Sequence, residues 1–249
     1  MKSFLRFLCM MLCLPLVGCA GNGAAKTPSQ IPAKTESPYP PADKLIAITF
    51  DDGPNESVMV MVLDLLEQHD VTATFFVVGN RINESNSKIL KRAYDMGCEI
   101  GNHGYSHIRM GTLPRDQMHT EIDKTQEAVR AVTGEAPKLF RPPYLNTSRV
   151  LGYEISNMPF ITGINGRDGT NDTNWQQRYD AVMDNVYDGC IVLMHCYSSA
   201  TETVKALEKI IPELRMQGYE FVTVSQLFAR VGYTPEVGTG TLIGDNKGQ

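Results

Sequence analysis

The sequence lacks the features that would place it outside the ordinary globular proteins. No apolar run approaches the roughly 20 residues that a membrane-spanning helix needs. Positive charge is in the minority, with 23 Lys and Arg against 28 Asp and Glu and a net charge of -5. A protein that binds DNA or RNA usually carries a basic face, so we expect no nucleic-acid partner. Six cysteines in 249 residues are too few for a scaffold built from disulfides.

What is present is an ordinary globular balance. Apolar residues make up 42% of the chain and charged residues 20%. This composition excludes a disordered chain, a coiled coil and a collagen-like fibre. The length is enough for one large domain with a full core.

The N-terminus has the pattern of an export signal. Lys2 and Arg6 precede an apolar run over residues 7–17, which is too short to span a bilayer. The run ends in Leu-Val-Gly-Cys, which resembles the bacterial lipobox, so we expect cleavage after residue 18 and lipid on Cys19. The predicted location is the outer side of the cytoplasmic membrane or the cell envelope, as an exported bacterial lipoprotein. A plain signal peptide and a buried apolar start are the alternatives.

Three further segments follow the signal. Residues 19–43 are rich in Pro, Ala, Ser, Thr and Lys without an apolar period, which predicts a flexible tether. Residues 44–232 carry the regular strand and helix patterns described next and are predicted to form one folded domain. Residues 233–249 are rich in Gly, Thr and Asp, and we expect a loosely ordered tail there. The redox state of Cys98, Cys190 and Cys196 stays open, although small buried thiols are the simplest expectation.

Within residues 44–232, short apolar runs typical of strands alternate with helical patterns. The runs are Leu45–Phe50, Ala73–Val78, Cys98–Gly101, Leu139–Phe140, Phe160–Ile164, Cys190–Met194 and Tyr219–Val222. Helical spacing joins two sets of apolar residues: Val58, Met61, Val62, Leu65 and Leu66, and then Val204, Leu207, Ile211 and Leu214. About seven strand–helix units predict an α/β fold with a parallel sheet, open or closed into a barrel. In such barrels chemistry gathers at the C-terminal ends of the strands.

Candidate metal ligands follow the first and third of these runs. Asp51 and Asp52 come directly after the first run, and of two adjacent carboxylates one can bind a cation while the other moves a proton. His103 and His107 follow the third run at a spacing of four, which allows both imidazoles to chelate one ion. Asp52, His103 and His107 together predict a three-ligand site with an open position for water, as in catalytic zinc centres.

Candidate acid–base and orienting residues follow the later runs. Arg141 opens the segment Arg-Pro-Pro-Tyr, which ends at Tyr144, and an arginine there can orient a carboxylate. Asp168 lies just beyond the fifth run, and His195 ends the sixth. Each residue alone is weak evidence, but all of them follow strands, as the barrel prediction requires.

The order of these motifs resembles that of the polysaccharide deacetylases of carbohydrate esterase family four. Thr-Phe-Asp-Asp-Gly-Pro, His-x-x-x-His, Arg-Pro-Pro-Tyr and Leu-Met-His occur here in the family's order across roughly residues 44–230. The resemblance implies a distorted (β/α) barrel of seven or eight units. It also implies a metal-dependent deacetylase that removes acetyl groups from N-acetylglucosamine in peptidoglycan or chitin-like glycans and releases acetate.

The resemblance implies a role for each matching residue. Asp51 would be the catalytic base, held by Arg141, while Asp52, His103 and His107 would bind a divalent metal, with Zn²⁺ expected first and Co²⁺ as the alternative. The remaining roles are these: the backbone N–H of Tyr144 as an oxyanion donor, Leu193 as the wall around the acetyl methyl group, His195 as the general acid and Asp168 as its partner.

The fourth motif departs most from the family, because the first aspartate and the tryptophan of Asp-x-x-Asp-Trp are missing around Asp168. Asp172, in Asn-Asp-Thr-Asn-Trp, is the rival position. Leu145 also replaces a common glycine, and Cys196 a common aspartate.

Several alternatives to an N-deacetylase stay open at this point. They are an esterase of O-acetyl xylan, a hydrolase of another small amide, a glycan-binding lipoprotein without activity, and a lipid-anchored metal carrier. The expected partners are an acetylated glycan and, through Cys19, a membrane, and the expected state is a monomer.

Overall fold

The computed structural model describes residues 40–244. The predicted signal over residues 1–18, the lipid site at Cys19 and residues 19–39 of the predicted tether lie outside the described residues. Within the described part, none of the helices combines the length and the apolarity that crossing a membrane requires.

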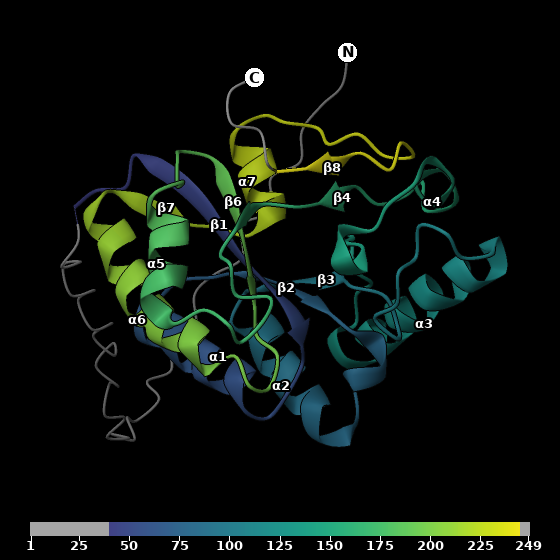
Figure 1. Cartoon of the computed structure of the whole chain (residues 1–249), viewed down its shortest axis with the longest axis horizontal. Helices are drawn as coiled ribbons and strands as arrows, with labels where there is room; N and C mark the ends of the chain where they lie inside the picture. The colour runs from purple at the N-terminus through teal and green to yellow at the C-terminus, as the bar shows by residue number, and fades with distance from the viewer. Residues whose placement is uncertain (1–39, 245–249) are drawn as a thin grey trace, which may run out of the picture. The chain divides into compact units, whose positions relative to one another are not determined.

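The centre of the fold is a set of parallel strands that close into a distorted barrel (Figure 1). The strands are β1 (Lys44–Gly53), β2 (Thr74–Val77), β3 (Glu99–Asn102), β4 (Phe160–Ile161), β5 (Ile164–Asn165), β6 (Cys190–His195), β7 (Tyr219–Phe221) and β8 (Leu242–Ile243). Along the main sheet the order is β3-β2-β1-β6-β5, and β7 pairs with the beginning of β1. Bridges from Asn102 to Phe140 and from Phe140 to Phe160 join β3 to the β4–β5 segment and so complete the ring. The predicted barrel-type α/β fold is therefore confirmed.

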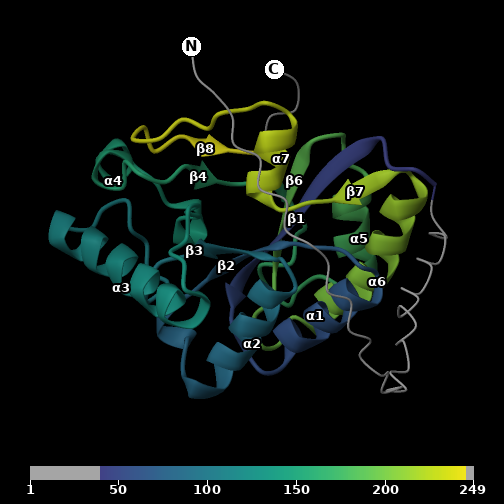
Figure 2. The ribbon, with the colours of Figure 1, turned by 180° about the vertical axis from the view of Figure 1, so that it is seen from behind.

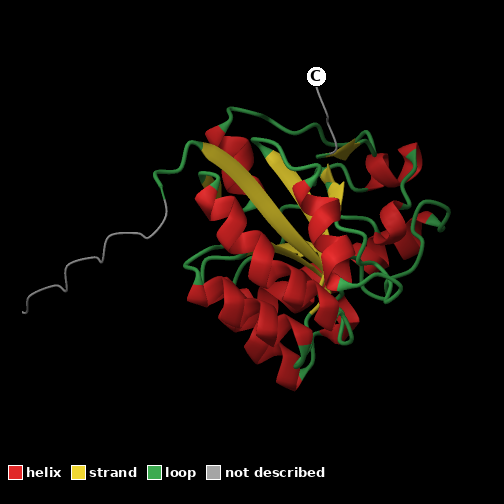
Figure 3. Cartoon of the chain, turned by 60° about the vertical axis from the view of Figure 1, so that its left-hand side comes forward, coloured by secondary structure: helices red, strands yellow, loops and turns green. Residues whose placement is uncertain are grey.

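Helices cover the outside of this ring (Figure 3). The α-helices are α1 (Val58–Gln68), α2 (Glu84–Asp95), α3 (Arg115–Thr133), α4 (Arg149–Glu154), α5 (Trp175–Met183), α6 (Thr201–Met216) and α7 (Val224–Arg230), and the short 3-10 turns are η1 (Gly79–Arg81) and η2 (Pro143–Leu145). Figure 2 shows α5 and α6 lying side by side, and α6 also packs on α1.

The alternation of residues along β1 decides which side chains enter the barrel. The large core between the barrel and its helices contains Ile46, Ile48 and Phe50. The core inside the barrel contains Ala47. Because side chains alternate along a strand, Thr49 and Asp51 follow Ala47 to the inside. The carboxylate of Asp51 therefore lies inside the barrel, at the C-terminal end of the strand.

The predicted helix faces agree with the structure unevenly. All four predicted apolar positions of α6 are buried. In α1 the buried residues are Val58, Met59, Val62, Leu63 and Leu66, while Met61 is 48% exposed. Met61 therefore fits the helical spacing but lies outside the buried face of α1, because an apolar run allows more than one helical face and only packing selects one.

Two predicted strands are shorter than their apolar runs. Leu139–Phe140 forms only isolated bridges, and the run Phe160–Ile164 divides into β4 and β5. The interruption arises because β4 pairs with β8 while β5 pairs with β6, so the segment changes partner as it crosses the barrel.

Part of the segment that is predicted to be a loosely ordered tail contributes to the barrel. Residues 242–243 form β8, which pairs in parallel with β4, and Ile243 is buried. The Thr162 N–H donates to the carbonyl of Ile243 at 2.8 Å, so the tail satisfies backbone groups at the barrel edge. A two-residue strand carries no alternating pattern, which explains why the sequence did not indicate it. Cys98, Cys190 and Cys196 are free and buried, as expected for small core thiols.

Candidate active site

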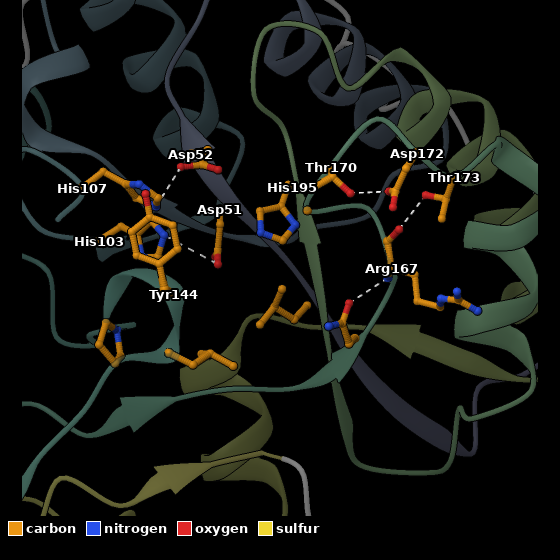
Figure 4. A pocket seen from close by; sticks show the side chains of 15 residues that line it. Asp51, Asp52, His103, His107, Tyr144, Arg167, Thr170, Asp172, Thr173 and His195 are labelled. Carbon is orange, nitrogen blue, oxygen red and sulfur yellow. Dashed lines mark hydrogen bonds and ion pairs between the residues drawn. The ribbon is translucent and has the colours of Figure 1, made fainter. Parts of the chain in front are cut away.

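The two aspartates at the end of β1 point in different directions because the strand is irregular there. Asp51 is 3% exposed, and the register of β1 against β2 shifts between Asp51 and Gly53. Asp52 has a φ of 74°, a left-handed conformation that a non-glycine residue adopts only at a cost. One carboxylate therefore enters the barrel while its neighbour turns toward the loop that carries the histidines (Figure 4).

Asp52, His103 and His107 form a cluster with the composition of a metal site. Each offers one ligand atom, and these atoms all lie within 4.8 Å of one another. Nδ1 of His103 lies 2.6 Å from the carbonyl of Arg141, which holds the ring and leaves Nε2 directed at the cluster. Nε2 of His107 lies 3.3 Å from Oδ1 of Asp52. Burial, followed by the neighbouring His103, lowers the pKa of His107 and favours the neutral imidazole that can bind a cation.

Arg141 is fully buried and holds Asp51. Its Nη1 donates to Oδ1 of Asp51 at 2.6 Å and to Oγ1 of Thr49 at 2.8 Å. Burial alone would raise the pKa of Asp51, but the charge of Arg141, together with His103 and His195, outweighs burial and lowers that pKa. Asp51 is therefore held as an ionised carboxylate at the floor of the cavity.

His195 and Asp168 form a second, separate pair on the other side of Asp51. Nδ1 of His195 lies 2.8 Å from Oδ1 of Asp168, whose Oδ2 also accepts the His195 backbone N–H. Desolvation works against the charged imidazole, but the hydrogen bond and charge of Asp168 dominate and raise the pKa of His195 to about 9. Asp172, the rival for this place, is exposed and bonds to Thr170 instead.

A cavity of about 490 Å³ brings these groups together, and Figure 4 shows the side chains that line it. His195 lies between the metal-type cluster and a wall formed by the loop over residues 167–173. Leu193 and Tyr144 also line the cavity, and the Tyr144 ring packs at a tilt of 54° against His107 with ring centroids 4.7 Å apart. Every predicted site residue within the described range is thus in or directly behind this cavity.

Backbone strain is concentrated at the same place. Five non-glycine residues that line the cavity have positive φ, namely Asp52, His107, Tyr144, Leu145 and Arg167. Conformations of this kind cost on the order of 1–3 kcal/mol each and persist where the surroundings enforce them. The concentration supports a functional cavity rather than a chance depression.

Four supporting residues were missed by the sequence analysis. Glu121 accepts hydrogen bonds from the backbone N–H groups of Tyr105 and Ser106 and so fixes the loop between the two histidines. Arg81 donates to the Asp52 carbonyl and lies 3.3 Å from its Oδ1. The other two, Thr203 and Arg178, lie behind Asp168. No short motif contains these residues, since each comes from a helix or turn far along the chain.

Comparison with known proteins gives a consistent result. The sequence model of the polysaccharide deacetylases matches residues 39–162. A bifunctional xylanase/deacetylase of Pseudobutyrivibrio xylanivorans is 41% identical over 194 residues, which are 78% of this chain but only 32% of that protein's length. A peptidoglycan-N-acetylglucosamine deacetylase of Bacillus cereus is 37% identical over 196 residues, covering 76% of this chain and 90% of that protein.

A solved structure extends the likeness to the fold. The family 4 acetyl xylan esterase from Clostridium thermocellum, solved in complex with a cobalt ion, superimposes with a TM-score of 0.78 at 38% sequence identity. The match covers 82% of this chain and all of that one (100%).

Proposed function

Since the chain belongs to the polysaccharide deacetylase family, we propose that it removes acetyl groups from an acetylated glycan by metal-assisted hydrolysis. One observation carries this proposal. A carboxylate with a lowered pKa and an imidazole with a raised pKa face the same cavity, beside a three-residue cluster suited to a metal. Paired groups whose pKa values are pushed apart are the signature of acid–base catalysis.

The residues divide the proton transfers between them. Asp51 accepts the proton of the attacking water, whose oxygen bonds to the acetyl carbon. When the carbon–nitrogen bond breaks, the nitrogen takes a proton from Nε2 of His195, and acetate and a free amino sugar leave. Arg141 holds Asp51 in place, the backbone N–H of Tyr144 stabilises the oxyanion, and Leu193 contacts the acetyl methyl group. A donor at an oxyanion contributes about 3 kcal/mol.

The cluster of Asp52, His103 and His107 fits a divalent metal, and we propose Zn²⁺, with Co²⁺ as the alternative. Two imidazole nitrogens and one carboxylate oxygen are ligands that zinc accepts in catalytic sites with an open position. When bound, such an ion supplies Lewis acidity, which polarises the acetyl carbonyl and lowers the pKa of water. This contribution matters because the lowered pKa makes Asp51 a weak base by itself.

The proposed substrate is a glycan that contains N-acetylglucosamine, as in peptidoglycan or chitin. The B. cereus relative, of which the chain covers nine tenths, is named for that substrate. A second candidate is O-acetyl xylan, because the P. xylanivorans relative and the C. thermocellum structure carry xylan in their names at 41% and 38% identity. The complete acid–base and ligand set supports an enzyme over a glycan-binding protein without activity, and the open ligand position supports catalysis over a metal carrier.

The test is acetate release from three substrates. The full chain loaded with zinc or cobalt is incubated with peptidoglycan, chitin oligomers or acetylated xylan, and the products are identified by mass spectrometry. We expect deacetylated glucosamine residues, and we expect Asp51→Asn, the matched control of equal size, to give none. Release from xylan alone would favour the second candidate, and release from none of the three would refute the proposed function.

We also propose that the chain is exported and anchored to a membrane by lipid on Cys19, and that it acts as a monomer at the cell envelope. The lipobox-like segment supports the anchor. Acyl chains stabilise membrane attachment by about 0.8 kcal/mol for each buried CH₂ group. A glycan of the cell wall is reachable from that position.

A further inference from the structure

A buried arginine lies behind the acid–base pair. Arg178, on α5, is fully buried. Its guanidinium donates to Oγ1 of Thr203 at 2.8 Å, to the carbonyl of Thr170 at 2.9 Å and to the carbonyl of Thr173 at 3.2 Å. Burying a cation costs several kcal/mol unless its donors are satisfied, so these contacts determine where the guanidinium lies.

Thr203 connects this arginine to Asp168. The Thr203 hydroxyl is buried and lies 2.8 Å from Arg178 Nη1 and 2.8 Å from Asp168 Oδ2. A guanidinium can only donate, so the hydroxyl oxygen accepts from Arg178 and its single proton must point at the carboxylate. The chain of hydrogen bonds therefore has one direction, from Arg178 through Thr203 to Asp168, and it meets the bond from His195 on the same carboxylate. Hydrogen bonds connected in this way strengthen one another.

The same arginine holds one wall of the cavity. Thr170 and Thr173, whose carbonyls accept from Arg178, both line the cavity. Oγ1 of Thr173 also donates to the carbonyl of Arg167, next to Asp168, at 2.6 Å. One side chain thus fixes both the carboxylate that orients His195 and the loop that faces the substrate.

We infer that Arg178 and Thr203 are positioning residues for the proton donor, with Thr203 aiming the Asp168–His195 pair and Arg178 also holding the substrate-facing loop. This inference rests on the proposed function. Neither residue lines the cavity, so Thr203 acts through the Asp168–His195 pair and Arg178 acts through Thr203 and through the loop that it holds. If the imidazole of His195 is held in the wrong orientation, it slows a reaction only where the leaving group needs a proton. An amine leaving an amide needs one, whereas an aryl alcohol leaving an activated ester does not.

The test compares two substrates across matched variants of the full metal-loaded chain. Initial rates are measured with chitin oligomers and with 4-nitrophenyl acetate for the wild type, Thr203→Val, Thr203→Ser, Arg178→Lys and the control Thr120→Val. Thr120 is an exposed threonine on α3, so its change to valine repeats the chemistry away from the site. Thermal unfolding of each variant shows that it is folded.

We expect Thr203→Val to lower kcat for the oligomer about 10- to 100-fold, since a general acid is worth 10² to 10⁴ in rate and is here displaced rather than removed. Its KM should stay unchanged, and its rate on 4-nitrophenyl acetate should stay within about threefold. Thr203→Ser, which keeps the hydroxyl, should recover most of the loss. Arg178→Lys should lower kcat and also raise KM, because it releases the wall at Thr170.

Equal losses on both substrates, or no loss on either, would overturn the inference. A wild type that hydrolyses the aryl ester but neither chitin oligomers nor peptidoglycan would refute the proposed N-deacetylation instead. In that case the positioning role of Thr203 and Arg178 is tested without a substrate. The measurement is the downfield NMR signal of the proton between His195 and Asp168 at one fixed pH. Thr203→Val should shift or broaden that signal and Thr120→Val should not, and an unchanged signal in Thr203→Val would refute the inference.

Discussion

The interaction between His195 and Asp168 predicts how activity depends on pH. The pKa of His195 rises from 6.5 to about 9, with the hydrogen bond and charge of Asp168 as the main favourable causes. At about 1.4 kcal/mol per pH unit, this is roughly 3 kcal/mol of preference for the charged imidazole. In Asp168→Asn the charge is gone while the size is kept, so the basic limb of kcat/KM should move from near pH 9 toward about 6.5.

The size of the effect can be stated at one pH. At about pH 8, the protonated fraction of His195 falls from roughly nine tenths to a few per cent, which predicts a loss of activity of about 30-fold. The assay is acetate release from chitin oligomers across the pH range, and the control is Asp172→Asn, which removes an exposed charge from the same loop. If Asp172→Asn moved the basic limb and Asp168→Asn did not, the assignment of Asp168 as the partner of His195 would be wrong.

The same pair predicts the pH dependence of stability. A folded-state pKa raised above 6.5 means that the native state binds its proton more tightly than the unfolded chain does. The stabilisation is fully present below about pH 6.5 and is lost as pH rises toward about 9. Chemical unfolding of the wild type should show this decline, and Asp168→Asn should flatten it. An equal slope in both proteins would contradict the assignment.

Three other perturbations test separate parts of the structure. His103→Ala leaves two ligands for the metal, so elemental analysis should find the ion lost together with activity, and full occupancy would exclude the proposed cluster. Cys19→Ser should release the protein from membranes into the soluble fraction, and unchanged sedimentation with membranes would refute the lipid anchor. Gly152→Ala places a Cβ 2.0 Å from the backbone nitrogen of Gly240, so it should displace the tail and lower the melting temperature by several degrees, whereas an unchanged melting temperature would mean that the tail contributes no stability.

The part of the site that the sequence predicted is the part that strand geometry determines. Asp51 and His195 are register partners on neighbouring parallel strands, so two residues at strand ends had to meet. The spacing of His103 and His107 in one loop likewise suffices to bring two imidazoles together. The first relation follows from parallel strand pairing and the second from local spacing, and a sequence pattern indicates relations of both kinds.

The parts that the sequence did not predict depend on contacts between distant segments. Ile243 joins the barrel through two residues whose pattern is indistinguishable from a loop. Thr203 contacts Asp168 from α6, and Arg178 contacts Thr203 from α5, so this chain of contacts depends on the packing of α5 on α6. Met61 shows the same limit, because an apolar residue in a helical pattern can face either way until the neighbouring surface is known.

Arg141 has a consequence for redesign of this barrel. Its guanidinium holds Asp51, while its own carbonyl lies 2.6 Å from His103 Nδ1. One residue, Arg141, therefore contacts both the proposed base and one of the proposed metal ligands. The loop over residues 167–173 lines the same cavity but does not contact Arg141, so it can be exchanged separately as long as Asp168 and its contacts are kept. A substitution that moves Arg141 would disturb both contacts at once, so that residue should be left unchanged in any redesign.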